Sequence, residues 1–147
     1  MYLSDDMKEL IQLFHEADVS FAICGGFAVA HHGFVRMTLD LDLLIDPAPE
    51  NGKKVLKALT QFGFGDVGVT EKSLSTPGTA ITLGAQPNQV DLLTSMSSAP
   101  TDEILKRSEP TLLDGIPVKV VSKPDLLQAK REANRPKDRI DLEELES

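Results

Sequence analysis

Residues 24–46 read CGGFAVAHHGFVRMTLDLDLLID, and this stretch decides the fold. The pair Gly25-Gly26 directly follows a short apolar run, and thirteen residues separate it from Asp40-Leu41-Asp42. The second run alternates aspartate with leucine, which is the pattern of a strand buried on one face. We therefore expect a strand, a glycine turn that opens a short helix, and a second strand that carries two aspartates.

The two aspartates of this second strand lie on the same face. Residues two apart on a strand point the same way, so Asp40 and Asp42 are roughly 6.6 Å apart along it. Two carboxylates placed like this repel each other unless a cation lies between them. An ordinary exposed strand also explains the alternation, but aspartate is a poor strand former and its repetition favours a site. The pair predicts divalent metal, and the glycine turn beside it predicts phosphate binding.

A third aspartate, Asp91, occurs inside the later apolar segment NQVDLL, residues 88–93. With the glycine pair and the acidic pair, it resembles the pattern of the DNA polymerase β-type nucleotidyltransferase superfamily. The branch that contains bacterial type IV abortive-infection toxins is the most similar. That further likeness rests on His32-Gly33, Arg36, Thr38, Lys130, Arg135, Lys137-Asp138 and Asp141. The resemblance implies an α/β (α+β) nucleotidyltransferase fold, a mixed sheet with helices packed mainly on one face.

The implied reaction moves a nucleoside monophosphate from an NTP to a hydroxyl group. Two Mg²⁺ ions about 3.5–4 Å apart assist such an in-line attack. Asp40 and Asp42 are expected to bridge the two ions. Asp91 is expected to hold the ion that activates the acceptor hydroxyl, or to position that hydroxyl itself.

The same resemblance places the nucleotide over the glycine turn. Backbone N–H groups of Gly25, Gly26 and Phe27 are expected to meet the β- and γ-phosphates, because glycine permits close approach and a helix start is electropositive. If the second strand extends back far enough, Arg36 and Thr38 share the face of Asp40, so Arg36 is expected to reach a phosphate with two hydrogen bonds. Lysines of the C-terminal helices, Lys123 or Lys130, are expected over the cleft.

The resemblance leaves the acceptor open between an RNA 3′ end, including that of a transfer RNA, and a protein side-chain hydroxyl. It also implies a toxin with a cognate antitoxin. A second hypothesis is a catalytically degenerate member that binds a nucleotide or a protein partner as a regulator. A third is an α/β interaction module in which the aspartate pair is incidental.

Composition narrows the class of protein. The formal charge of −8 argues against broad attraction to nucleic acid, although basic residues gather between positions 119 and 139. The single cysteine, Cys24, fits a reducing compartment, and with no apolar run near twenty residues the expected location is the cytoplasm, without a membrane span. Adjacent histidines diverge on a helix and no nearby Cys, Asp or Glu completes a zinc site, so His31-His32 predicts capping and packing.

We expect one domain over residues 1–147, with a core at about 1–95 and a helical extension at about 122–147. Gly63 and Gly65 are expected to end the third helix, and residues 63–78 are expected to form a loop with room for an edge strand. The expected helices are Ser4–Ala17, Gly26–Gly33, Pro49–Phe62, Asp102–Arg107 capped by Thr101, one after Ser122 and one from Pro136. The expected strands are Phe21–Cys24, Met37–Ile45, Ala80–Leu83, Gln89–Leu93, Leu112–Leu113 and Ile116–Val121.

Overall fold

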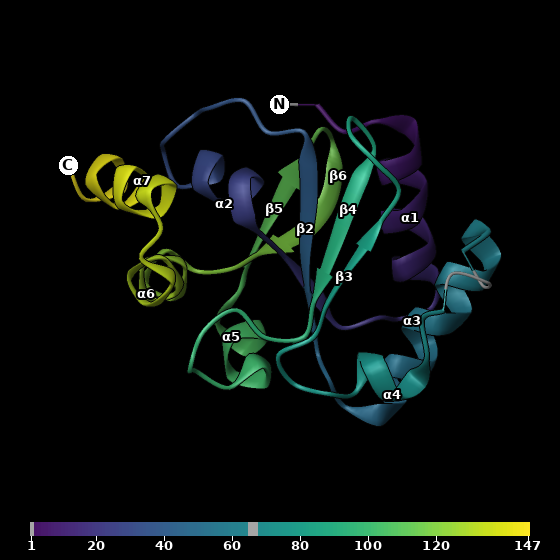
Figure 1. Ribbon diagram of the computed structural model, residues 1–147. Helices are drawn as coiled ribbons and strands as arrows, with labels where there is room; N and C mark the ends of the chain where they lie inside the picture. Colours follow the sequence, from purple (N-terminus) through teal and green to yellow (C-terminus); the bar gives the residue numbers. More distant parts are fainter. Residues whose placement is uncertain (1, 65–67) are drawn as a thin grey trace.

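A six-stranded mixed sheet runs through the protein, with helices on both sides (Figure 1). The computed structural model describes residues 2–64 and 68–147. The helices are α1 (Asp5–Glu16), α2 (Gly25–His31), α3 (Pro49–Phe62), α4 (Glu71–Leu74), α5 (Thr101–Arg107), α6 (Lys123–Ala133) and α7 (Pro136–Glu146). The strands are β1 (Phe21–Cys24), β2 (Asp40–Ile45), β3 (Ala80–Leu83), β4 (Gln89–Leu93), β5 (Glu109–Leu113) and β6 (Ile116–Val120).

The strand order is β3-β4-β2-β1-β6-β5. Strand β2 runs antiparallel to β1 and parallel to β4, and β1 runs parallel to β6. Two antiparallel hairpins, β3-β4 and β5-β6, form the two edges. The predicted mixed sheet is therefore confirmed.

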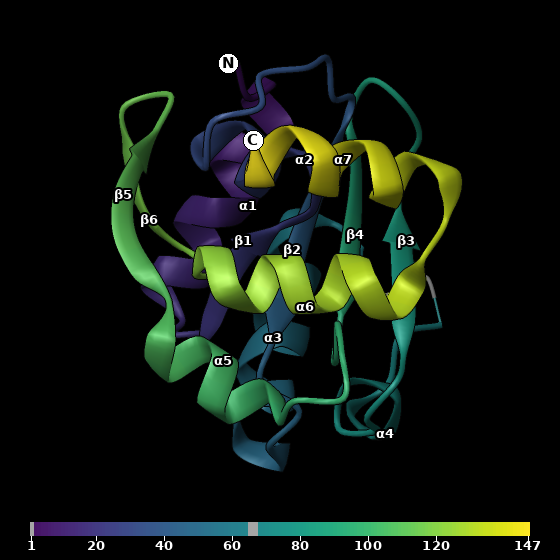
Figure 2. The ribbon, with the colours of Figure 1, turned by 90° about the vertical axis from the view of Figure 1, so that its left-hand side faces the viewer.

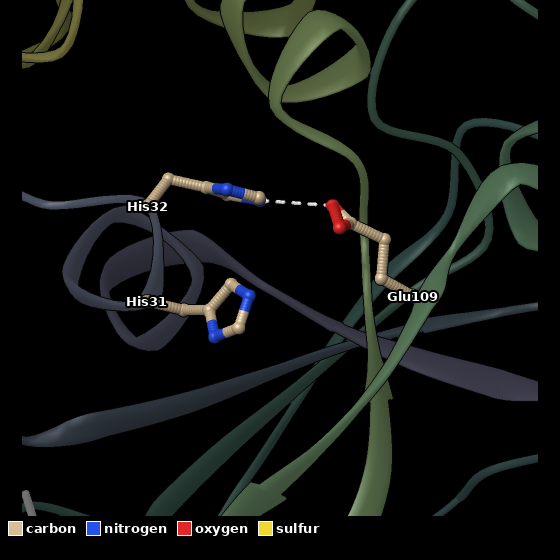
Figure 3. A group of neighbouring side chains, drawn as sticks. All are labelled: His31, His32 and Glu109. Atoms are coloured by element: carbon tan, nitrogen blue, oxygen red, sulfur yellow. Dashed lines mark ion pairs between the residues drawn. The ribbon is translucent and has the colours of Figure 1, made fainter.

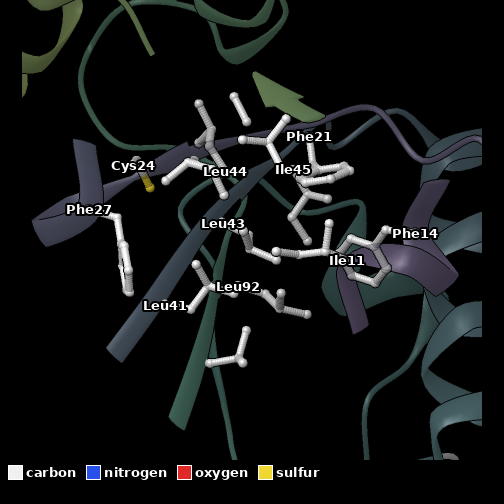
Figure 4. Close-up of a cluster of buried hydrophobic side chains, with 14 of the residues drawn as sticks. Ile11, Phe14, Phe21, Cys24, Phe27, Leu41, Leu43, Leu44, Ile45 and Leu92 are labelled. Carbon is white, nitrogen blue, oxygen red and sulfur yellow. The ribbon is translucent and has the colours of Figure 1, made fainter. Parts of the chain in front are cut away.

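The two faces of the central strands differ sharply in polarity. Leu41 and Leu43 of β2 are fully buried on one face, while Asp40 and Asp42 are half-buried on the other. Strand β4 repeats this alternation, with Leu92 on the apolar face. Figure 4 shows that face packed against α1 side chains. Burial of large aliphatic side chains, each contributing about 1.5–3 kcal/mol, fixes the register and so decides where the aspartates point.

Helices α6 and α7 lie on the polar side of the sheet, and Figure 2 shows α6 crossing in front of it. Ser122 caps α6 by accepting a hydrogen bond from the backbone N–H of Asp125 at 3.3 Å. Leu126 and Leu145 anchor the two helices in the hydrophobic core. These helices therefore face the aspartates across a gap.

Several boundaries differ from the expectations. Strand β2 begins at Asp40, because its ladder with β4 starts there, whereas its ladder with β1 covers only Asp42 to Ile45. Residues 63–78 contain the short helix α4 and, where described, no strand; the expected stop at Gly65 lies outside the described residues. Thr101 is the first residue of α5, not its cap, and its hydroxyl donates to the carbonyl of Thr94 at 2.7 Å. The helices divide between both faces more evenly than expected (Figure 1).

Within the described residues, no helix has the length and apolar character needed to cross a membrane.

Candidate active site

A row of four residues crosses the polar face of the sheet at one register. Cys24 of β1 pairs with Asp42 of β2, Asp42 with Asp91 of β4, and Asp91 with Thr82 of β3. Neighbouring strands are about 4.8 Å apart, so the carboxylates of Asp42 and Asp91 lie side by side. Asp40 is two residues before Asp42 on the same face. The fold therefore brings together the three aspartates singled out from the sequence, with Asp42 in the middle.

The glycine pair lies directly beside this row, and neither position has space for a side chain. Gly25 has φ of +65°, and a Cβ there would overlap the Asp42 carboxylate. At Gly26 a Cβ would lie 2.7 Å from Oγ1 of Thr38. Glycine is thus required twice, once for a left-handed backbone and once for close approach. Both glycines line a cleft of about 780 Å³ together with the three aspartates.

Asp42, in the middle of the row, has a strongly shifted pKa. Burial, then the neighbouring Asp91 carboxylate and then Asp40 raise the pKa of Asp42 to about 7, while Lys137 opposes this. Such a shift arises when a carboxylate loses water and gains like charges without a counter-ion nearby. The structure therefore holds a concentration of negative charge that a cation would relieve.

Neutral side chains from β3, β4 and their turn hold the outer two aspartates. Thr82 donates its hydroxyl hydrogen to Oδ1 of Asp91 at 2.7 Å, and Nε2 of Gln89 donates to both Asp91 oxygens. Nε2 of Gln86, in the β3-β4 turn, donates to Oδ1 of Asp40 at 3.1 Å. These donors fix carboxylate orientation without adding charge, so each aspartate keeps lone pairs for another ligand.

The opposite wall of the cleft is built on two buried aspartates of α7. Asp138 and Asp141 are almost fully buried and both accept from Nζ of Lys130, at 3.3 and 3.0 Å. Burial raises the pKa of Asp138, but hydrogen bonds from Arg135 and Lys130 outweigh it and lower the pKa to about 2. The network fastens α7 to α6 and to the segment before β2.

This network changes the role expected for Arg36. Its Nε and Nη2 donate to the two Asp141 oxygens at 3.0 and 3.1 Å, so the fork predicted for a phosphate already grips α7. Its Nη1 still lies on the Gly26 side of the cleft. Thr38 donates its hydroxyl hydrogen to the carbonyl of Asp40 at 3.1 Å, and its side chain packs closely against Gly26. The sequence around Arg36 gave no sign that its partner would be Asp141 of α7.

The other residues expected to bind the nucleotide are Lys123, Phe27 and Lys130. Lys123 does not line the cleft, because it begins α6, and only the later turns of that helix, from Leu126, reach the cleft. The side chain of Phe27 is buried in the core (Figure 4), and the expectation concerned only its backbone N–H, which lies in the first turn of α2. Lys130 does line the cleft, as expected, but as the partner of two carboxylates.

We expect Lys130→Met to destabilise the protein by about 3 kcal/mol, because removing one partner from a buried ion network leaves carboxylates poorly compensated. Lys123→Met should change the free energy of unfolding by less than about 0.5 kcal/mol, since its side chain is outside the network. Urea unfolding of both variants measures this. Equal stability of the two variants would contradict the network.

A second group of possible metal ligands lies where α2 ends. His31, His32 and Glu109 of β5 offer ligand atoms that all lie within 4.8 Å of one another (Figure 3). Glu109 is far from the two histidines in the sequence, so the spacing of nearby residues did not predict it as a third ligand. However, Nε2 of His32 lies 2.8 Å from the carbonyl of Val121 and 4.0 Å from Glu109. With that nitrogen donating its proton to the carbonyl, it has no lone pair for a metal, and the cluster reads as packing at the end of α2.

The donor set of the aspartate row fits magnesium. Hard oxygen ligands, few in number and open to a cleft that admits phosphate and water, are what Mg²⁺ takes in proteins. The charge concentrated at Asp42 and the Cβ-free cradle at Gly25 are the two structural observations that support this fit. Asp40, Asp42 and Asp91 are the residues that would hold the metal.

A family model described as "Nucleotidyl transferase of unknown function (DUF2204)" matches residues 3–147. The chain belongs to this family. It is accordingly a nucleotidyltransferase by family, which agrees with the activity class predicted from the glycine and aspartate pattern. No curated protein matches the chain.

Among solved structures, the nucleotidyltransferase-family chain is similar to ANT(2″)-Ia in complex with adenylyl-2″-tobramycin. The TM-score is 0.56 at 14% sequence identity, and the match covers 94% of this chain and 84% of that chain. This likeness concerns the fold, and it confirms the predicted nucleotidyltransferase architecture.

Sequence reasoning missed Thr82, Gln86 and Gln89 as partners of the aspartates. Gln89 had a signal, since it shares strand parity with Asp91. Thr82 and Gln86 had none, because cross-strand register and turn geometry brought them to the site.

Proposed function

We propose that this family member catalyses Mg²⁺-dependent transfer of a nucleoside monophosphate from an NTP to a hydroxyl acceptor. The observation that carries the proposal is the row Cys24, Asp42, Asp91, Thr82, with the Gly25 backbone at one end. The row and the glycine turn lie side by side, which supports binding of a phosphate group next to carboxylates that share one face. A solved structure with this fold holds adenylyl-2″-tobramycin, which supports an NMP as the transferred group.

Two magnesium ions, bound to Asp40, Asp42 and Asp91, would polarise the α-phosphate and lower the pKa of the attacking hydroxyl. The chain's own groups do the rest. Backbone N–H groups of Gly25, Gly26 and Phe27 orient the β- and γ-phosphates at the start of α2. Thr82 and Gln89 hold the Asp91 carboxylate against rotation, so that it can position the acceptor hydroxyl and take its proton.

We expect Asp91→Asn to bind Mg-NTP within about threefold of wild type but to lose transfer by on the order of a thousandfold. The reason is that Asp91 lies on the acceptor side of Asp42, away from the glycine turn. Calorimetry with Mg-ATP and Mg-CTP measures binding, and α-labelled NTP incubated with total RNA and cell protein measures transfer. Label transfer by the variant at the wild-type rate would refute the assignment, and nucleotide binding without any turnover by wild type would favour a regulator.

The acceptor is the finer part of the proposal. An RNA 3′ end and a protein hydroxyl are the two candidates, and the labelled fraction in the same experiment chooses between them. A toxin role with an antitoxin partner stays a prediction from the resemblance.

A further inference from the structure

Lys137 occupies an unusual position on the cleft wall opposite the aspartates. It is the second residue of α7, after Pro136, and its side chain lines the cleft. A cation in the first turn of a helix opposes the positive end of the helix dipole, at a cost of about 0.3–1 kcal/mol. The first turn of α7 also holds an acidic residue in the preferred place, Asp138. The interaction of Lys137 with the dipole of its own helix therefore does not explain why a lysine occupies this position.

The other cations of the cleft are already paired. Arg36 grips Asp141, Lys130 contacts Asp138 and Asp141, and Arg135 contacts Asp138. Within residues 2–64 and 68–147, Lys137 makes no ion pair or side-chain hydrogen bond with another residue. It is thus the cleft cation whose charge remains available to a ligand.

We infer that Lys137 is a substrate-binding residue whose ammonium group meets the triphosphate from the side opposite the Gly25-Gly26 backbone. This inference rests on the proposed function. The side chain of Lys137 lines the same cleft as the Gly25-Gly26 pair and the three aspartates. A triphosphate between the glycine turn and α7 would thus lie between backbone N–H groups and this ammonium.

The transfer step needs a cation at that place. The acceptor oxygen forms a bond to the α-phosphorus, and the bond from that phosphorus to the bridging oxygen breaks, so pyrophosphate leaves with the electron pair. The hydroxyl proton goes to Asp91 or to water. Negative charge therefore grows on the pyrophosphate, and the Lys137 ammonium stabilises it while keeping its own protons.

The test uses Mg-pyrophosphate as a probe that has no base, so that the unknown base preference of the cleft does not matter. Calorimetry compares wild type with Lys137→Gln, Lys137→Arg and the matched control Arg139→Gln. Arg139 is an exposed cation of the same helix outside the cleft. We expect Lys137→Gln to weaken binding of Mg-pyrophosphate and Mg-ATP by about tenfold or more, Lys137→Arg to restore most of it, and Arg139→Gln to match wild type.

Thermal unfolding separates this role from a structural one. Lys137→Gln should unfold at the wild-type temperature or above, because the unfavourable dipole interaction is removed. Unchanged ligand affinity in Lys137→Gln, or a loss of affinity that Lys137→Arg fails to restore and that accompanies a lower unfolding temperature, would overturn the inference. If wild type itself binds neither ligand, the proposed function fails together with it, whereas binding by wild type and by Lys137→Gln alike overturns this inference only.

Discussion

We expect Asp42→Asn to lower the rate of nucleotidyl transfer by on the order of a thousandfold. The same substitution should raise the stability of the metal-free protein. Asp42 is the central carboxylate of the row, so its loss would remove the ligand that we propose is shared by both magnesium ions. The same carboxylate, buried beside Asp91 and Asp40, has its pKa raised from 3.8 to about 7. Its ionisation therefore opposes folding.

The pH dependence of stability follows from this shift. Between about pH 4 and pH 7 the folded protein keeps the Asp42 proton while the unfolded chain has released it, so the unfolded state binds fewer protons. Stability due to this group is thus present at low pH and is lost as the pH rises to about 7. One pKa unit corresponds to about 1.4 kcal/mol, so the full effect is a few kcal/mol.

Urea unfolding of the metal-free proteins at pH 5 and pH 8 measures this effect. The wild type should lose stability between the two values by clearly more than Asp42→Asn does. Added Mg²⁺ should stabilise wild type at pH 8 and have little effect on the variant, because a ligand that binds only the folded state raises its stability. Parallel pH profiles for the two proteins would contradict the electrostatic account of the row.

Gly25→Ala is expected to lower transfer by about a hundredfold or more and to destabilise the fold. The added Cβ overlaps the Asp42 carboxylate, which must move away from its place beside Asp91. Small displacements of reacting groups have effects of this size on rate. Alanine at positive φ adds about 1–2 kcal/mol of backbone strain.

Gly78→Ala is the matched control for that variant. Gly78 has φ of +79°, close to the +65° of Gly25, but a Cβ there meets nothing within 4 Å. Both variants carry similar backbone strain, so the difference between them in unfolding free energy and in transfer rate measures the overlap with Asp42 alone. If the two variants behave alike, the glycine is required for its backbone conformation and not for the site.

The alternation of aspartate with leucine predicted the half of the site that lies on adjacent strands. Burial of Leu41 and Leu43 leaves Asp40 and Asp42 only one face to occupy, and the same parity in β4 turns Asp91 the same way. The glycine pair similarly predicted the turn into α2, because φ of +65° beside a carboxylate leaves no other residue type. The local sequence pattern was therefore sufficient to predict the strand face of the aspartates and the glycine turn.

The opposite wall of the cleft was decided only in three dimensions. Arg36 and Asp141 are 105 residues apart in the chain, and no local period links them. The packing of α7 against the sheet brought Asp141 to the Arg36 fork and Lys137 to the cleft, and the packing of α6 left its first residue, Lys123, outside the cleft. Local hydrophobic spacing determines the face of a strand, whereas the pairing of charges between distant helices depends on how those helices pack.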